Sequence, residues 1–365
     1  MNKLSDHITD PAMLEAMARV EAAAMTTPWL GMLAEELIDL LYRQGGATTF
    51  WTHYSTRREE VGHALGKDAD CYLAYVYERA YPKLVARYRE RDYSEQVLAA
   101  TLRDFNIRVH NYWGMYGYAG IDDYNWLTLH MTASLVQLGR LQFIFDKHAN
   151  YGTRIYRSRR DGSLVVVAEG GQPVNCRGFI SDVDPAFHTV LTENEERITA
   201  HLINVHGDVL RDQTVLDLQE YECLLRDGDP VIDIHIPAEG KLDMAACRSS
   251  LDEALAFAER YYPEIAYKGF VCASWLLSDE LAETLSPESN LVRFSALFTR
   301  CAGGEGEHSL IYRWIFGMDK ERESYKSHEA VTTLQRGAHR LLDEGRWYRG
   351  RSGFIPLAGQ DAGRN

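Results

Sequence analysis

The chain has 365 residues, and its 39 Lys and Arg against 53 Asp and Glu give a formal net charge of −14 at pH 7. This acidic balance excludes a protein that coats nucleic acid, because phosphate binding needs a basic surface. Hydrophobic residues make up 45% of the chain and charged residues 25%, which are ordinary globular values. We therefore expect a folded chain of two or three domains with a sizeable core.

The apolar stretches are interrupted by charged residues well before the roughly 18 residues that a membrane-spanning helix needs, so no membrane association is expected. The N-terminus lacks the basic and then apolar layout of a signal peptide, which makes a cytoplasmic location the expectation. The cysteines are scattered without a CxxC pair, which predicts free thiols and no metal site. They are Cys71, Cys176, Cys223, Cys247, Cys272 and Cys301.

The first part of the chain carries helical signals. Asp10 followed by Pro11 predicts a helix start, and Ser94 predicts another. Pro82 lies within a helical pattern and should kink or split it. The glycine-containing aromatic stretch 105–126 indicates a packed loop between helices, either as core or as a wall for an apolar ligand tail. Apolar spacing predicts helices over 13–25, 29–42, from about 70, from 94 and over 126–138.

From residue 139 onward the pattern changes to alternation, which predicts a mixed α/β unit. A loop is expected over 169–185, and the tail 360–365 is expected to be disordered. Strands are expected over 141–145, 154–157, 164–168, 198–206, 231–236, 268–276, 308–316 and 350–357. Helices are expected over 216–226, 243–262, 286–298 and 332–342.

The clearest unit runs from residue 231 to residue 276. Polar and apolar residues alternate strictly over 231–236, a loop follows over 237–241, and Asp243 caps a helix. The strands on either side of this helix should be parallel, because a strand–helix–strand crossover makes them so. Helix N-termini after such loops present free backbone N–H groups, which can hold phosphate.

Several runs occur in a fixed order and carry a resemblance to a known family. The sequence resembles bacterial acyltransferase-domain proteins that have an N-acyltransferase N-terminal domain and a GNAT-like C-terminal domain. The runs are GRLQF (139–143), GDPV with HIP (228–231 and 235–237), CASWLL (272–277), SNLVRF (289–294), and TLQR with GRW (333–336 and 345–347).

The resemblance implies an α+β fold, with a helical N-terminal domain over 1–138 and a GNAT-like mixed sheet domain over 139–359. It also implies an acyl-CoA co-substrate and an amine acceptor, either a small molecule or a peptide. Asn290 would lie near the cofactor arm. The cofactor phosphates would meet Pro237, Ala238, Gly240 and Lys241. This loop has one glycine and an added acid, where the GNAT pattern has two small residues, and a solvated turn is its alternative interpretation.

His235 is the candidate general base for removing a proton from the attacking amine. On its strand it shares a face with Asp233, whose carboxylate could raise the basicity of the imidazole. A structural histidine, hydrogen-bonded at a sheet edge or under a loop, is the alternative.

Cys272 and Ser274 share one face of the next expected strand. Cys272 could be a core residue, could line an acyl pocket or could be a nucleophile, and the apolar residues beside it argue against a reactive thiolate. Ser274 could donate a hydrogen bond to the thioester oxygen or to the thiolate, or it could pair with backbone.

The leading hypothesis is a GNAT-like N-acyltransferase that moves an acyl group from acyl-CoA to an amine by direct transfer. A non-catalytic GNAT-shaped binding or scaffold module is the rival, and an enzyme that takes its acyl group from an acyl-carrier protein is a third possibility. The single glycine of the loop 237–241 favours the last two. The sequence leaves the acyl group, the acceptor and the oligomeric state open.

Overall fold

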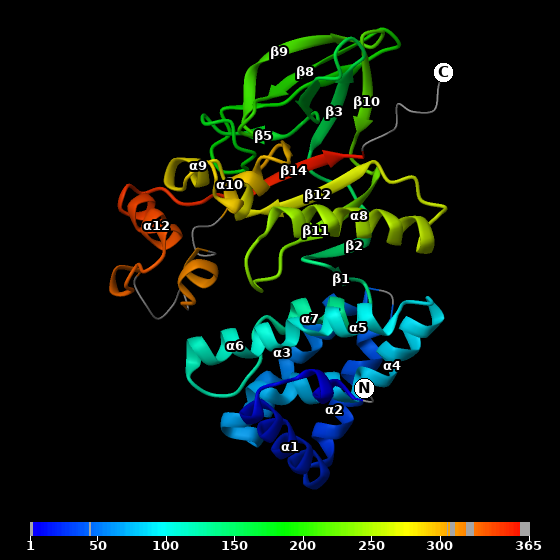
Figure 1. Cartoon of the computed structure of the whole chain (residues 1–365), viewed down its shortest axis with the longest axis vertical. Coiled ribbons are helices and arrows are strands. Elements are labelled where there is room, and N and C mark those ends of the chain that lie inside the picture. The colour runs from blue at the N-terminus through cyan, green and yellow to red at the C-terminus, as the bar shows by residue number, and fades with distance from the viewer. Residues whose placement is uncertain (1–2, 44, 305, 307–310, 319–324, 358–365) are drawn as a thin grey trace. The chain divides into compact units, whose positions relative to one another are not determined.

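The computed structural model describes residues 3–43, 45–304, 306, 311–318 and 325–357 (Figure 1). The chain forms two compact units. Unit 1 comprises Met1–Ile144, Ile236–Lys241 and Ser249–Phe257, and unit 2 comprises Phe145–His235, Leu242–Arg248 and Ala258–Asn365. Within the described ranges, no helix is long and apolar enough to cross a membrane.

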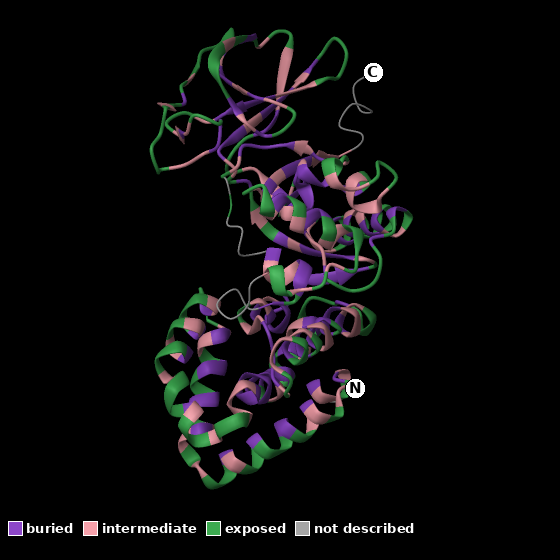
Figure 2. Ribbon diagram, turned by 90° about the vertical axis from the view of Figure 1, so that its left-hand side faces the viewer, coloured by how far each residue is buried: buried purple, intermediate pink, exposed green. Residues whose placement is uncertain are grey.

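Unit 1 is built mainly from helices with buried and exposed sides (Figure 2), and the first residues of α4, 72–77, are buried all round. Two of the predicted helix starts are confirmed: Asp10 accepts a hydrogen bond from the Met13 N–H at 2.7 Å, and Ser94 accepts one from the Val97 N–H at 3.3 Å. The elements are η1 (Leu4–His7), α1 (Pro11–Thr26), α2 (Pro28–Leu41), α3 (Gly46–Leu65), η2 (Gly66–Cys71), α4 (Tyr72–Glu90), α5 (Glu95–Leu102), α6 (Asp104–Tyr116), α7 (Tyr124–Met131) and β1 (Val136–Leu138).

Several expectations for this half were wrong. Helix α3 was not predicted, and its mixed polar and aromatic sequence is only weakly amphipathic. Helix α4 is not split at Pro82, because packing of its buried face outweighs the loss of one backbone hydrogen bond. Of the stretch 105–126, residues 105–116 belong to helix α6, and only 117–123 form a connection between helices, from α6 to α7. The expected helix over 126–138 ends at Met131 and is followed by strand β1.

A buried ionic cluster lies at the centre of unit 1. The Asp104 carboxylate is 3.1 Å from Nε of Arg108 and 3.3 Å from Nε2 of His130, and the Asp104 and His130 side chains are fully buried. Nδ1 of His130 lies 3.3 Å from the Trp126 carbonyl oxygen, and Arg108 also pairs with Asp123 at 3.2 Å. Buried charges are tolerated only when they are paired in this way.

Unit 2 contains two sheets. In the central sheet, the second half of β2 (Leu141–His148) is followed in space by β11 (Pro230–His235), β12 (Gly269–Ser274), β14 (Arg351–Pro356) and β13 (Thr299–Arg300) (Figure 1). The first half of β2 pairs with β1 in unit 1. As predicted, β11 and β12 are parallel.

The second sheet of unit 2 is inserted between β2 and β11. Its strands are β3 (Thr153–Ser158), β4 (Leu164–Ala168), β7 (Leu191–Glu193), β8 (Arg197–Ile203), β9 (Val209–Asp217) and β10 (Tyr221–Leu225). The short strands β5 (Pro173–Val174) and β6 (Phe187–His188) pair separately. One apolar core joins the two sheets, with Ile155, Val166 and Ile203 from the inserted sheet and Val231, Val271 and Phe354 from the central sheet.

The remaining elements are α8 (Met244–Tyr261), η3 (Trp275–Leu277), α9 (Glu280–Thr284), α10 (Asn290–Ser295), η4 (Tyr312–Phe316), η5 (Tyr325–Ser327) and α12 (Thr333–Asp343). Two expectations were wrong here. Residues 216–226 form parts of β9 and β10 and not a helix, and 312–316 form a π-helix where a strand was expected. Residues 308–310 of that expected strand, and the tail 360–365, lie outside the described residues.

The buried cluster of unit 1 gives a prediction about stability. Replacing Asp104 with Ala should lower the free energy of unfolding by about 3 kcal/mol, because the buried Arg108 guanidinium then loses one of its counter-charges and His130 loses a buried polar partner. Chemical denaturation of the variant and the parent protein measures this difference. Asp39→Ala is the matched control, because Asp39 pairs with Lys83 on the surface and its loss should leave the denaturation midpoint unchanged. Equal midpoints for the two variants would contradict a stabilising role for the cluster.

Candidate functional site

The register of the central sheet decides which candidate side chains can act together. Asp233 of β11 is level with Val271 of β12, and Val271 is level with Phe354 of β14. Residues that are level with each other project to the same face of a sheet, and the next residue projects to the opposite face. Asp233 and His235 therefore lie on the face of Val271 and Ala273, whereas Cys272 and Ser274 lie on the other face.

The face with His235 carries a paired acid and base. Nε2 of His235 lies 3.4 Å from Oδ2 of Asp233, and Nζ of Lys147 lies 3.8 Å from the same oxygen. The Asp233 side chain is 8% exposed and that of His235 is 26% exposed. A carboxylate that faces Nε2 favours the tautomer with its proton on that nitrogen, and the lone pair then lies on Nδ1. His235 thus lies beside a buried carboxylate with Nε2 covered, and the side chain as a whole is partly exposed, which a proton acceptor requires.

The neighbours of His235 leave space at the sheet surface. Ala273 is exposed although it belongs to a central strand, and its partner on β14, Ser352, is half-buried. A small exposed side chain at this position leaves the strand uncovered there. Burial raises the pKa of Tyr151, and the charge of Asp233 raises it further, so this phenol stays neutral near the carboxylate.

Cys272 does not have the surroundings of a nucleophile. Its side chain is buried, and burial is the main cause that raises the pKa of its thiol, with the charge of Asp233 adding to the effect. A reactive cysteine needs the opposite shift and access to substrate. The position of Cys272 is that of a core residue.

Ser274 has a structural use at the end of β12. Its Oγ accepts a hydrogen bond from the Leu276 N–H at 3.1 Å and caps η3. Asn290 is half-buried at the first position of α10, and the preceding Ser289 makes no side-chain capping bond there. The register therefore groups His235 with Asp233 and separates both from Ser274.

The candidate phosphate loop belongs to unit 1. Pro237 is buried, whereas Ala238, Gly240 and Lys241 are exposed. Gly240 has φ +61°, and no heavy atom lies within 4 Å of the position where a Cβ would stand. The backbone conformation thus favours glycine here, and the absence of a side chain leaves an open surface. In unit 2, Asp243 caps α8 as predicted, because its carboxylate accepts a hydrogen bond from the Ala246 N–H at 2.9 Å.

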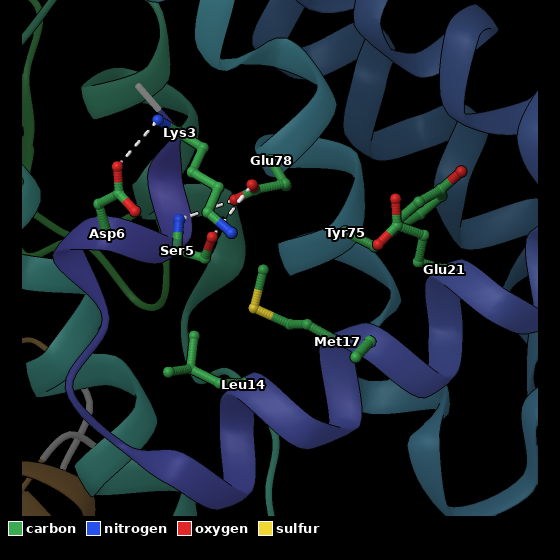
Figure 3. Close-up of a pocket in the computed structure, with 9 residues that line it drawn as sticks. Lys3, Ser5, Asp6, Leu14, Met17, Glu21, Tyr75 and Glu78 are labelled. Carbon is green, nitrogen blue, oxygen red and sulfur yellow. Dashed lines mark hydrogen bonds between the residues drawn. The ribbon is translucent and has the colours of Figure 1, made fainter. Parts of the chain in front are cut away.

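A separate pocket lies among the helices of unit 1 (Figure 3). Its volume is about 360 Å³, and it includes Met17, Glu21, Tyr75 and Glu78. The N–H and Oγ of Ser5 donate to the Glu78 carboxylate at 2.8 and 3.1 Å, so this acid already has partners. The pocket contains none of the residues that the sequence singles out for chemistry.

Sequence reasoning missed Lys147 as a neighbour of the acid–base pair. It lies on β2, and only the three-dimensional order of strands places it beside β11. Ala273 appeared in the sequence only as part of the run CASWLL (272–277). The signal available for it was the alternation of β12, which puts residues 271 and 273 on one face.

Comparisons with known proteins agree with this fold. The family model described as GNAT-like C-terminal domain matches residues 135–355, and the one described as N-acyltransferase N-terminal domain matches residues 6–133. No curated protein matches the chain.

Solved acyltransferase structures have a similar fold. One is an acyltransferase mutant in complex with octanoyl-CoA, with a TM-score of 0.65, 19% identity, and coverage of 97% of this chain and 86% of that chain. Another is an acyltransferase in complex with decanoyl-CoA, with a TM-score of 0.59, 20% identity, and coverage of 92% and 80%. A third, in complex with decanoyl-CoA and teicoplanin, has a TM-score of 0.54, 21% identity, and coverage of 80% and 68%.

The chain has the helical first half and the mixed sheet that the resemblance implied, and the GNAT-like model spans more than half of its length. The protein therefore belongs to the family defined by the N-acyltransferase N-terminal domain and the GNAT-like C-terminal domain.

Proposed function

We propose that the protein is an N-acyltransferase that moves an acyl group from acyl-CoA directly to an amine, with His235 as the general base. The observation that carries the proposal is the partly exposed His235, whose Nε2 lies 3.4 Å from the buried Asp233 carboxylate. Solved proteins of similar fold were crystallised with decanoyl-CoA or octanoyl-CoA, which supports a fatty acyl donor for this chain as well.

The reaction needs one proton acceptor and a carbonyl that can be attacked. The neutral amine attacks the thioester carbonyl carbon, and a nitrogen–carbon bond forms. Nδ1 of His235 takes the proton that the amine must lose, and Asp233 stabilises the resulting imidazolium. The carbon–sulfur bond then breaks, and the leaving thiolate takes the proton from the His235 imidazolium, so that an amide and free coenzyme A result and His235 is neutral again.

The position of Cys272 and the raised pKa of its thiol support direct transfer. Cys272 lies on the face of the sheet opposite His235, and burial raises the pKa of its thiol. An acyl-cysteine intermediate would need a thiolate with a base on its own side. A single complex of enzyme, donor and amine is therefore the mechanism that these residues support.

The donor's phosphates would be held by the loop with Pro237, Ala238, Gly240 and Lys241. The positive φ of Gly240 and the exposure of the loop fit close approach of an anion to the backbone. Asn290, at the start of α10, would contact the cofactor arm. The acceptor would be a small molecule or a peptide with a free amine. Teicoplanin, the ligand of one similar structure, exemplifies a peptide-based acceptor.

The loop assignment predicts a change in donor affinity. Gly240→Asp adds a negative charge and a side chain that disfavours φ +61°. We expect it to weaken decanoyl-CoA binding at least tenfold in isothermal titration calorimetry, while Gly162→Asp, at a glycine of similar φ in the β3–β4 turn, leaves binding unchanged. If the parent protein binds no acyl-CoA at concentrations well above ~10 µM, a carrier-protein donor or a non-catalytic binding module becomes the better account.

The assignment of His235 as the general base gives a second prediction. His235→Ala should lower kcat and kcat/KM together by about 10²- to 10⁴-fold, because the base acts on a proton in the transition state. Donor affinity should change little. Cys272→Ser is the control and should keep most of the activity. A His235→Ala protein with a lower melting temperature and a normal specific activity would show that the histidine is structural.

A further inference from the structure

Arg140 makes an unusual set of contacts within unit 1. Its backbone N–H donates to Oγ of Ser250 at 2.7 Å. Its side-chain Nε donates to the Lys241 carbonyl oxygen at 3.0 Å, and its Nη1 donates to the Pro237 carbonyl oxygen at 3.1 Å. One guanidinium therefore closes the loop 237–241 by holding the carbonyl groups at its first and last residues.

The backbone at Arg140 is held in place by the preceding glycine and by Ser250. Gly139 has φ +59°, and a Cβ there would lie 2.6 Å from Oγ of Ser250. Only glycine permits this close approach, which lets Ser250 bond the next N–H. Arg140 thus belongs to a turn between β1 and β2 that the hydrogen bond to Ser250 holds in place.

These contacts determine where the amide groups of the loop point. In a trans peptide the C=O and the following N–H point in opposite directions. Because the Pro237 carbonyl faces Arg140, the Ala238 N–H faces away from it. The same holds for the N–H that follows the Lys241 carbonyl. The guanidinium also carries a positive charge beside the Pro237 and Lys241 carbonyl groups. This charge favours an anion near the face of the loop to which the Ala238 N–H points.

We propose that Arg140 is a positioning residue that shapes the loop 237–241 so that its backbone N–H groups face the phosphates of the acyl-CoA donor. This proposal rests on the proposed function, because the loop's ligand is the donor assigned there. Arg140 acts through the backbone and not by contact with the reacting atoms. The arrangement also explains how a loop with a single glycine holds a defined shape.

The experiment compares Arg140→Met and Arg140→Lys in the full chain. Met keeps the aliphatic length but loses both carbonyl bonds, and Lys can restore one of them. We expect Arg140→Met to weaken decanoyl-CoA binding about 10- to 100-fold by calorimetry, because the loop loses both hydrogen bonds that fix its carbonyl groups. Arg140→Lys should fall between this variant and the parent. Arg89→Met removes an equal charge from an exposed site on α4 and should bind normally.

Two further readouts separate positioning from a general loss of stability. Hydrogen–deuterium exchange of the loop 237–241 should become faster in Arg140→Met, and trypsin should cleave faster after the exposed Lys241. In steady-state assays the KM for the donor should rise, while kcat stays within about threefold.

The outcomes distinguish this inference from the proposed function. If the parent binds no acyl-CoA but Arg140→Met still loosens the loop, the proposed function fails and the shaping role of Arg140 stands without its assigned ligand. If the parent binds acyl-CoA and Arg140→Met binds it equally well, the inference is overturned. An equal loss in Arg140→Lys and Arg140→Met, together with a lower melting temperature for both, would overturn it too, because the residue would then be needed only for folding.

Discussion

The parallel pairing of β11 with β12 is the constraint on which the account of the site depends. It sets Asp233 level with Val271, and the antiparallel pairing with β14 continues the same row to Phe354. A shift of one residue between these strands would place Cys272 on the face of His235 and Val271 on the other face. The apolar row of Val231, Val271 and Phe354 fixes this register, because these side chains fill the core shared with the inserted sheet. Core packing thus selects the face on which the acid–base pair stands.

Much of the fold could be predicted from the sequence, because local signals coincide with the observed elements. Capping by Asp10, Ser94 and Asp243 and the alternation over 231–236 were sufficient to locate helices and a strand. The errors fall where tertiary packing overrides local preference, as at Pro82 in α4. They also fall where strands look helical, as in β9 and β10, whose apolar residues occur at a spacing compatible with either structure.

The candidate site could be predicted only in part. The spacing of Asp233 and His235 on one strand indicates a shared face, and the structure places them 3.4 Å apart. Lys147 could not be found in this way, because its place beside Asp233 depends on the spatial order of strands that are far apart in the sequence. The role of Arg140 likewise depends on contacts that span about a hundred positions of the chain. Alternation within one strand is visible in a sequence, whereas register between strands is not.

Native and denaturing mass spectrometry of the protein with decanoyl-CoA tests direct transfer from acyl-CoA most directly. The account predicts a non-covalent complex under native conditions, which dissociates on denaturation to leave the chain at its unmodified mass. Adding an amine acceptor should then release free coenzyme A and form the acylated amine. An acyl mass that remains on the denatured chain and disappears in Cys272→Ser would contradict direct transfer, and a complete lack of complex would contradict acyl-CoA as the donor.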